Sequence, residues 1–471
     1  MKTGNRQDST FVRMTTMPVG HLIVKMAIPT IISMMVSALY NMADTFFVSQ
    51  LGTSASGAVG IIFSLMAIIQ AAGFTIGMGS GSTLSRKLGA RKNDEANEYS
   101  STGIILAFSL GTLMAIFGIA FQSKIITSLG ATPTILPYAQ DYARYILLAC
   151  PFMVTAFVMN NQLRFQGKAA FSMIGLTTGG ILNIILDPIF IFVLKLGISG
   201  AAIATLISQC VSFSILLSWF VRRRSSTVLS FSKLSKRPAV YATIIKNGMP
   251  SLCRQGLASI SAIFLNVAAA KYGALQAPPE SLPQTIGAFA DAAVAGMSIT
   301  SRLFMFLMSV ALGLGQGFQP VSAMNYGAKL YRRVKDAYLF LAKLTAVIMS
   351  VFTIIVLIFA PQIAKAFRDD PAVIKIAAFT MRFQSLFLPL HALIFGTNTL
   401  LQTTGNAKSA TFLSSLRQGL YFIPLILILP LFFGMRGVQL TQGISDLLTA
   451  LTSIPFIVTF FHRLTKEESS L

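Results

Sequence analysis

Charged residues are scarce in this chain of 471 residues. Lys, Arg, Asp and Glu make up 11% of the sequence, against about 25% in an average protein. Apolar residues make up 54%, and the mean hydropathy of +0.71 belongs to a chain whose solvent is mostly lipid. This composition excludes the several soluble domains that the length alone would suggest.

Cysteine and histidine are scarcer still, with three residues of each. Cys150, Cys210 and Cys253 lie in apolar runs, which excludes a disulfide framework and a zinc-binding spacing. The histidines are scattered, and the apolar runs hold no HExxH or Ser-Lys arrangement. An intramembrane enzyme is therefore disfavoured, and we expect no catalytic residue, no resident metal and no organic cofactor.

Long apolar runs are what the sequence does have. A spanning helix needs about 20 apolar residues, and short polar turns separate about twelve such runs. We therefore predict an all-α membrane protein with about twelve transmembrane helices. The predicted spans are 22–49, 57–83, 98–121, 135–161, 170–194, 198–221, 243–271, 286–314, 334–360, 372–400, 410–432 and 437–461.

The 37 basic residues far outnumber the 15 acidic ones. In a soluble protein this balance would suggest nucleic acid, but here the basic residues gather in alternate loops. With the N-terminus inside, the inner segments hold 23 Lys and Arg and the outer loops hold 6. This asymmetry predicts a multi-pass protein of the inner (plasma) membrane with both termini in the cytoplasm and no nucleic-acid partner.

Internal similarity divides the chain into two halves. The segment 197–203 recurs as 434–440, and the Gly-rich segment 77–81 recurs as 313–317. Because each half has an even number of helices, the repeats are parallel, and two such lobes facing one cleft form a transporter layout. The predicted parts are a cytoplasmic tail over 1–21, a six-helix lobe over 22–221, a cytoplasmic linker over 222–246, a second six-helix lobe over 247–462 and a cytoplasmic tail over 463–471. We expect a monomer.

An aspartate and an asparagine interrupt the apolar run 181–193. Asn183 and Asp187 are four residues apart and would share one face of a helix. Pro188 follows and would leave the carbonyl of Ile184 without its helical donor. Acids within spanning segments are rare and usually face a protein interior or a water-filled cavity. The pattern predicts a cation or proton site, although a structural acid satisfied by Asn and Thr neighbours would look the same.

Asp44 also lies well inside an apolar run. Desolvation favours the neutral form of a carboxylic acid, and a second carboxylate nearby strengthens that preference. Two such acids could share a proton, or Na+ could supply the missing charge with hard oxygen ligands. Pro29 in the same run frees the carbonyl of Lys25, and the sequence leaves a static kink and a moving hinge equally open.

In order, these motifs resemble the multidrug and toxic compound extrusion (MATE) transporters, and most of all the prokaryotic branch that includes the DNA-damage-inducible F proteins. The resemblance covers residues 20–460 and rests on Pro29, Tyr40-Asn41-Met42-Ala43-Asp44-Thr45, Gln166-Gly167-Lys168-Ala169, Asn183-x-x-x-Asp187-Pro188 and Gly197-x-x-Gly200-Ala201-Ala202-x-Ala204-Thr205. It implies export of small amphipathic, often cationic, compounds against inward flow of H+ or Na+.

Carried over residue by residue, the resemblance implies an ion-coupling set of Asp44, Asn160, Asn183, Asp187 and Thr205, with a hinge at Pro29. Sodium, if it is the coupling ion, would bind at Asp44, Asn183 and Asp187.

The second half departs from the polyspecific branches, which carry acids on the seventh and tenth helices. Here those helices carry Arg254 and Arg382, and Arg302, Arg417 and Asp446 complete a predicted charge cluster. The cluster is interpreted either as ion pairs within the lobe core or as a basic cavity for an acidic group of a substrate. Basic residues also keep open a lipid or lipid-linked oligosaccharide flippase of the same superfamily, whereas a channel is disfavoured because no filter-like segment occurs.

Overall fold

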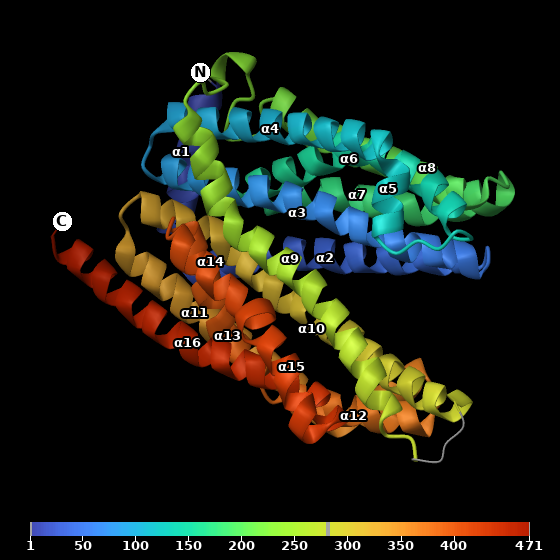
Figure 1. The fold of residues 1–471 in the computed structure, drawn as a ribbon. Helices are drawn as coiled ribbons and strands as arrows, with labels where there is room; N and C mark the ends of the chain where they lie inside the picture. The colour runs from blue at the N-terminus through green and yellow to red at the C-terminus, as the bar shows by residue number, and fades with distance from the viewer. Residues whose placement is uncertain (1, 279–282, 471) are drawn as a thin grey trace. The chain divides into compact units, whose positions relative to one another are not determined.

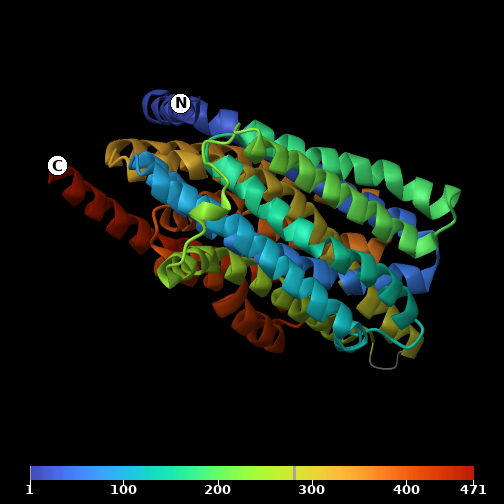
Figure 2. The ribbon, with the colours of Figure 1, turned by 90° about the horizontal axis from the view of Figure 1, so that it is seen from above.

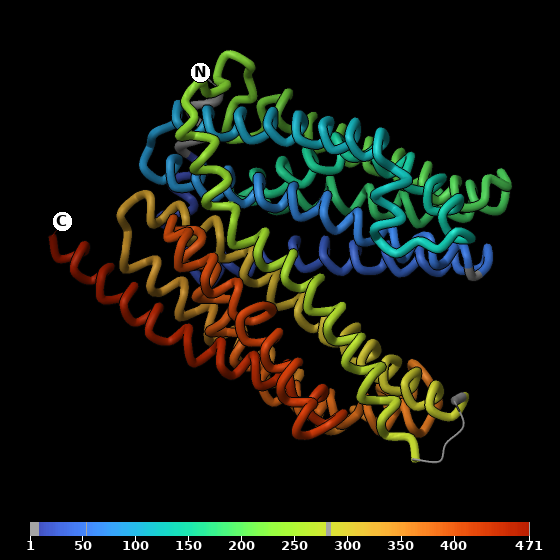
Figure 3. Tube along the Cα trace, viewed as in Figure 1, coloured from blue at the N-terminus to red at the C-terminus, as the bar shows by residue number. Residues whose placement is uncertain are grey.

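The computed structural model describes residues 2–278 and 283–470, and in that part of the chain helices and turns make up the whole structure. Residues 1, 279–282 and 471, which include the ends of both predicted tails, lie outside the described residues. Figure 1 shows the helices as a ribbon and Figure 3 shows the same trace as a tube. In chain order they are α1 (Lys2–Thr16), α2 (Val19–Ser49), α3 (Thr53–Gly89), α4 (Asn93–Ala120), α5 (Gln122–Ser128), α6 (Leu136–Phe165), α7 (Ala169–Pro188), η1 (Ile189–Val193), α8 (Gly197–Val221), η2 (Phe231–Lys233), α9 (Pro238–Ala274), α10 (Pro283–Gly327), α11 (Tyr331–Phe367), α12 (Pro371–Ser385), η3 (Leu388–Leu390), α13 (His391–Thr403), α14 (Ala407–Ser415), η4 (Leu416–Leu420), α15 (Phe422–Phe433) and α16 (Met435–Ser469).

Eleven helices of the described residues are long and apolar enough to cross a membrane. A twelfth span results if α12 and the segment from η3 through α13 count as one helix bent by 42°. The predicted all-α membrane fold is therefore confirmed.

The bent pair corrects one predicted element. The sequence predicted a continuous helix over 372–400, but α12 ends at Ser385 and a short 3-10 turn precedes α13. Pro389 lies in that turn, and a proline lacks the N–H that a continuing helix would need there. Pro188 has a milder effect, because the backbone continues from α7 into the π-helical turn η1.

The chain divides into two compact units. Unit 1 consists of residues 1–252, 316–334 and 402–407, and unit 2 consists of residues 253–315, 335–401 and 408–471. Unit 1 thus takes in the first part of α9, one end of α10, the first residues of α11 and the turn after α13, in addition to the six spans of the first half.

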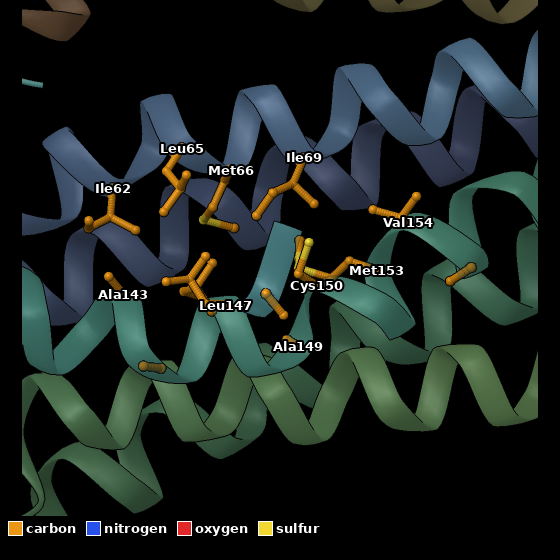
Figure 4. Close-up of a cluster of buried hydrophobic side chains, with 14 of the residues drawn as sticks. Ile62, Leu65, Met66, Ile69, Ala143, Leu147, Ala149, Cys150, Met153 and Val154 are labelled. Atoms are coloured by element: carbon orange, nitrogen blue, oxygen red, sulfur yellow. The ribbon is translucent and has the colours of Figure 1, made fainter. Parts of the chain in front are cut away.

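In unit 1, α6 packs against α3, α4, α7 and α8, and Figure 2 shows these long helices from above. Apolar side chains of α3 and α6 form its core, including Ile62, Met66, Leu147 and Met153 (Figure 4). This core holds α6 in the middle of its neighbours, and Tyr142 and Asn160 on α6 bond to α2 and α7.

Two reciprocal pairs of glycines bring backbones of unit 1 into contact. A Cβ atom at Gly79 of α3 would overlap the carbonyl of Ile244 on α9, and one at Gly248 of α9 would overlap the carbonyl of Thr75 on α3. Gly89 of α3 and Gly327 of α10 repeat the arrangement. Small residues allow membrane helices to approach this closely.

The predicted linker packs on unit 1 rather than extending into water. Ser225, Ser226 and Thr227 are buried, and the backbone N–H of Ser226 donates to Gln166 Oε1 at 2.6 Å. The Ser100 and Thr227 hydroxyls lie 2.9 Å apart. α9 already begins at Pro238, so the second half of this polar stretch is helical.

Unit 2 contains two apolar clusters. One joins α10, α11 and α12, and includes Phe304, Met349 and Met381. The other joins α9, α10, α12, α15 and α16, and includes Phe422 and Met435. α16 also packs against α12, α15, η3 and η4, which places the polar residues near its middle inside the unit.

Candidate functional site

The Asn183–Asp187 pair lies inside unit 1, on the face of α7 that meets α8. Asn183 Nδ2 donates to Asp187 Oδ1 at 3.2 Å and lies 3.2 Å from the Thr205 hydroxyl of α8. Asp187 is fully buried, and Asn183 and Thr205 are 2% and 3% exposed. The four-residue spacing therefore does place the amide beside the carboxylate.

Small residues explain why α8 lies close enough to contribute Thr205. The Ser212 hydroxyl of α8 donates to the Gly175 carbonyl of α7 at 2.6 Å. A Cβ atom at Gly179 would lie 2.6 Å from the Ser212 oxygen, so any larger residue there would separate the two helices. The Gly-rich face of α7 thus positions the polar face of α8.

Asp44 of α2 is buried and accepts a hydrogen bond of 3.0 Å from the Tyr142 hydroxyl of α6. That hydroxyl also lies within hydrogen-bonding reach of Thr205, and the Asp44 and Asp187 carboxylates are close enough to interact electrostatically. Four helices of one unit therefore bring Asp44, Tyr142, Thr205, Asn183 and Asp187 together. We call these five residues the carboxylate cluster.

Three buried oxygens of the carboxylate cluster have no hydrogen-bond donor among the described residues. They are Asp44 Oδ1, Asn183 Oδ1 and Asp187 Oδ2. Within residues 2–278 and 283–470, no Lys, Arg or His side chain pairs with either carboxylate. Buried acceptors of this kind are costly unless a proton or cation satisfies them, and oxygen atoms are the ligands that hard cations prefer.

Asn160 is placed elsewhere on α6. Its Nδ2 donates to the backbone carbonyl of Ser172 on α7 at 3.0 Å. Asn160 follows Tyr142 along the same helix by about 27 Å at 1.5 Å per residue, so the structure does not bring it into the carboxylate cluster. Its hydrogen bond joins α6 to the start of α7.

Pro29 lies inside α2, which continues unbroken from Val19 to Ser49. The neighbouring hydroxyls bond to the backbone of the same helix. Thr30 Oγ1 donates to the Met26 carbonyl and Ser33 Oγ donates to the Pro29 carbonyl, both at 3.0 Å. Pro29 therefore permits a continuous helix in this conformation.

In unit 2, Arg417 and Asp446 form the ion pair that the predicted charge cluster required. Arg417 Nε lies 2.7 Å from Asp446 Oδ1, and Gln442 Nε2 donates to the same oxygen at 2.9 Å. His391 Nε2 lies 3.5 Å from the other carboxylate oxygen. Arg417 is mostly buried and Asp446 is fully buried. Of the two interpretations of the cluster, these two residues fit the ion pair within the lobe core.

The other three arginines of the predicted cluster lie apart from Asp446. Arg382 is exposed and its Nε donates to the Leu357 carbonyl at 3.0 Å, Arg302 is exposed and Arg254 is half-buried. Among the described residues, none of these arginines pairs with an acid. The structure therefore reduces the five-residue cluster to one ion pair and adds His391 and Gln442 to it.

Sequence reasoning missed several of the residues that complete these sites. No motif marks Tyr142, which is a single hydroxyl in an apolar run, and His391 lies 55 positions before its partner Asp446. Arg164 is one of the 23 basic residues that the loop charges assign to the inner segments, but it is buried and donates to Gln316 Oε1 at 2.6 Å and Gln319 Oε1 at 3.2 Å. The position of Arg164 in the last turn of a spanning helix was the one signal that could have indicated its burial.

The chain is similar over nearly its whole length to known exporters. It is 29% identical over 448 residues to the multidrug export protein MepA of Staphylococcus haemolyticus (strain JCSC1435), covering 94% of both chains. It is 28% identical over 455 residues to the multidrug export protein MepA of Staphylococcus aureus (strain N315), covering 96% of this chain and 97% of the other.

Solved structures show the same fold. A multidrug resistance MATE family transporter of the MOP superfamily in an outward-facing conformation is 28% identical, with a TM-score of 0.88 over 97% of this chain and 98% of the other. A MOP superfamily transporter from Pyrococcus furiosus Vc1, described as having a binding pocket of reverse polarity, is 27% identical, with a TM-score of 0.87 over 96% and 98%.

The family model named MatE matches residues 29–189 and 285–428, which is more than half of the chain. The two matched segments contain Asp44, Asn183 and Asp187 in the first and His391 and Arg417 in the second. This match confirms the resemblance at the level of the family. The chain therefore belongs to the MatE family of cation-coupled membrane transporters, which are not enzymes.

Proposed function

We propose that this protein exports amphipathic organic compounds, mostly cationic drugs or metabolites, in exchange for H+ or Na+ bound at the carboxylate cluster. One observation carries the proposal. Asp44, Asn183 and Asp187 present three buried oxygens that have no hydrogen-bond donor in the described part of the chain, inside a membrane-spanning unit. The names of the MepA relatives support drugs as the class of substrate.

The carboxylate cluster couples ion binding to transport if the two transport states differ in ion affinity, since an ion shifts an equilibrium only by its differential affinity. The five residues come from α2, α6, α7 and α8. A change in the position of α2, which contains Pro29, would therefore change the distance between Asp44 and the other four residues. This is how we propose that Pro29 acts as a hinge.

The first prediction tests the coupling role of Asp187. In Asp187→Asn the side chain keeps its shape but loses its charge, so we expect a loss of more than about tenfold in drug efflux driven by a pH or Na+ gradient, because each 1.4 kcal/mol of lost ion binding is tenfold. Efflux of cationic and anionic dyes from liposomes with each gradient imposed separately measures the loss and identifies the coupling ion. Asp141→Asn is the matched control, since Asp141 is an exposed acid on α6. Full ion-driven efflux by Asp187→Asn would refute the proposed coupling site.

We further propose that the protein is a monomer in the inner (plasma) membrane. The loop charges favour an orientation with both termini in the cytoplasm. Within the family, the order of sequence motifs supports the branch of the DNA-damage-inducible F proteins.

A further inference from the structure

His391 and Asp446 in unit 2 face each other through two atoms that have no hydrogen bond. His391, at the start of α13, is 1% exposed, and Asp446, near the middle of α16, is fully buried. His391 Nε2 and Asp446 Oδ2 are 3.5 Å apart. Neither atom has a hydrogen-bond partner among the described residues.

The other ring nitrogen determines which tautomer the neutral imidazole adopts. His391 Nδ1 lies 3.2 Å from the Phe387 carbonyl oxygen and 3.1 Å from the Leu388 carbonyl oxygen. Carbonyls accept hydrogen bonds and do not donate them, so Nδ1 must carry the hydrogen. Because a neutral imidazole has a single N–H, Nε2 then directs a lone pair at a carboxylate oxygen.

We propose that the His391–Asp446 pair is a second proton-binding site, separate from the carboxylate cluster of unit 1. A hydronium ion gives one proton to the lone pair of His391 Nε2, so that one O–H bond breaks, a new N–H bond forms and a neutral water molecule is left. The resulting imidazolium donates a charge-assisted hydrogen bond to Asp446 Oδ2. The facing lone pairs are thereby replaced by an ion pair.

The neighbouring charges act on this proton in opposite directions, since the Asp446 carboxylate attracts it and the Arg417 guanidinium repels it. Arg417 and Gln442 both bond to Asp446 Oδ1, which leaves Oδ2 for His391. Asp446 and Arg417 are the charged groups that act on the ring from α16 and η4, while η3 contributes the Leu388 carbonyl and α13 the Phe395 ring, whose centroid is 5.5 Å from that of His391. Proton uptake changes the net charge of the Arg417–Asp446–His391 group from zero to plus one, which disfavours a cationic substrate in the same unit.

Nitrogen NMR of the full-length protein in lipid nanodiscs, with 15N-labelled histidine, tests this site directly. We expect the His391 signals to show hydrogen on Nδ1 alone at about pH 8, with a population that has hydrogen on both nitrogens growing as the pH is lowered to about 4. In Asp446→Asn, an amide N–H meets the bare Nε2 instead, so the doubly protonated population should fall by at least about tenfold at the same pH. His391→Gln assigns the signals, and His462→Gln, an exposed histidine on α16, is the matched control.

The experiment has outcomes that would overturn the site. Hydrogen on Nε2 alone at about pH 8, or no doubly protonated His391 down to about pH 4, would exclude it from the wild-type spectra alone. An unchanged doubly protonated population in Asp446→Asn would exclude Asp446 as the partner. If that variant does not fold, the double variant Arg417→Gln/Asp446→Asn is compared with Arg417→Gln, so that the loss of the arginine charge is common to both. The NMR measurement requires no transport. Full efflux by Asp187→Asn would therefore refute the coupling proposal and leave the protonation of His391 unaffected.

Discussion

At the scale of single residues, Tyr142 is the link between Asp44 and the other acid of the carboxylate cluster. Its hydroxyl donates to Asp44 Oδ2 and lies within reach of Thr205. A hydrogen bond to a charged group contributes about 1.5–3 kcal/mol, so Tyr142→Phe should lower ion-driven dye efflux by about tenfold or more. Because the hydroxyl acts through Asp44, it should have little further effect in the Asp44→Asn background.

The control for this double-mutant cycle is Tyr145→Phe, one turn further along α6, where the ring packs against the apolar core. An equal loss in Tyr145→Phe, or additive losses for Tyr142→Phe and Asp44→Asn, would show that Tyr142 does not act through Asp44.

Part of the carboxylate cluster could be predicted from the sequence because it is local. The spacing of Asn183 and Asp187 on one helix places them on one face, and the hydrogen bond between them shows that arrangement. Tyr142 lies 98 positions from Asp44, and its contact depends on how α2 and α6 pack. No local pattern encodes that packing. His391 was missed for the same reason, since a lone histidine in an apolar run predicts no partner.

At the scale of the helices, the reciprocal glycines set how closely α3 and α9 pack. Gly79→Ala would place a Cβ atom on the Ile244 carbonyl and close to the Gly248 nitrogen. These are backbone atoms, which cannot rotate away as a side chain could. We expect Gly79→Ala to lower the free energy of unfolding by about 1–3 kcal/mol or more. Thermal unfolding of the purified protein in detergent measures this loss.

Gly60→Ala on the same helix is the control, because nothing lies within 4 Å of the added Cβ. Alanine is a better helix former than glycine by about 1 kcal/mol, so Gly60→Ala should be neutral or slightly stabilising. Equal unfolding temperatures for the two variants would show that the contact of α3 with α9 is not tight.

The helices also show where hydropathy is informative and where it is not. Apolar runs correctly located the spans because lipid requires them. The ends were less accurate, since α3 and α10 continue through polar residues to Gly89 and Gly327 beyond the predicted 83 and 314. The break before α13 was missed because a proline within an apolar run is compatible with both a bent and a straight span.

At the scale of the whole molecule, the number of spans decides on which side of the membrane the C-terminus lies. If the bent pair of α12 and α13 crosses once, the chain has twelve spans and both termini share one side, whereas eleven spans would place them on opposite sides. The basic residues after α16, Arg463 and Lys466, favour the cytoplasm.

We therefore predict that green fluorescent protein fused to either terminus is fluorescent and that alkaline phosphatase at either terminus is inactive, because the loop charges favour a cytoplasmic position for both ends. Alkaline phosphatase inserted after Lys195, between η1 and α8, should be active, since the loop charges predict an outer position for that turn. Insertion in the turn between α11 and α12, at Asp369, should also be active. Activity there, together with a cytoplasmic C-terminus, would require the bent pair of α12 and α13 to cross the membrane. An active phosphatase at the C-terminus combined with an inactive one at the N-terminus would mean eleven spans, with α12 and α13 entering and leaving on the same side.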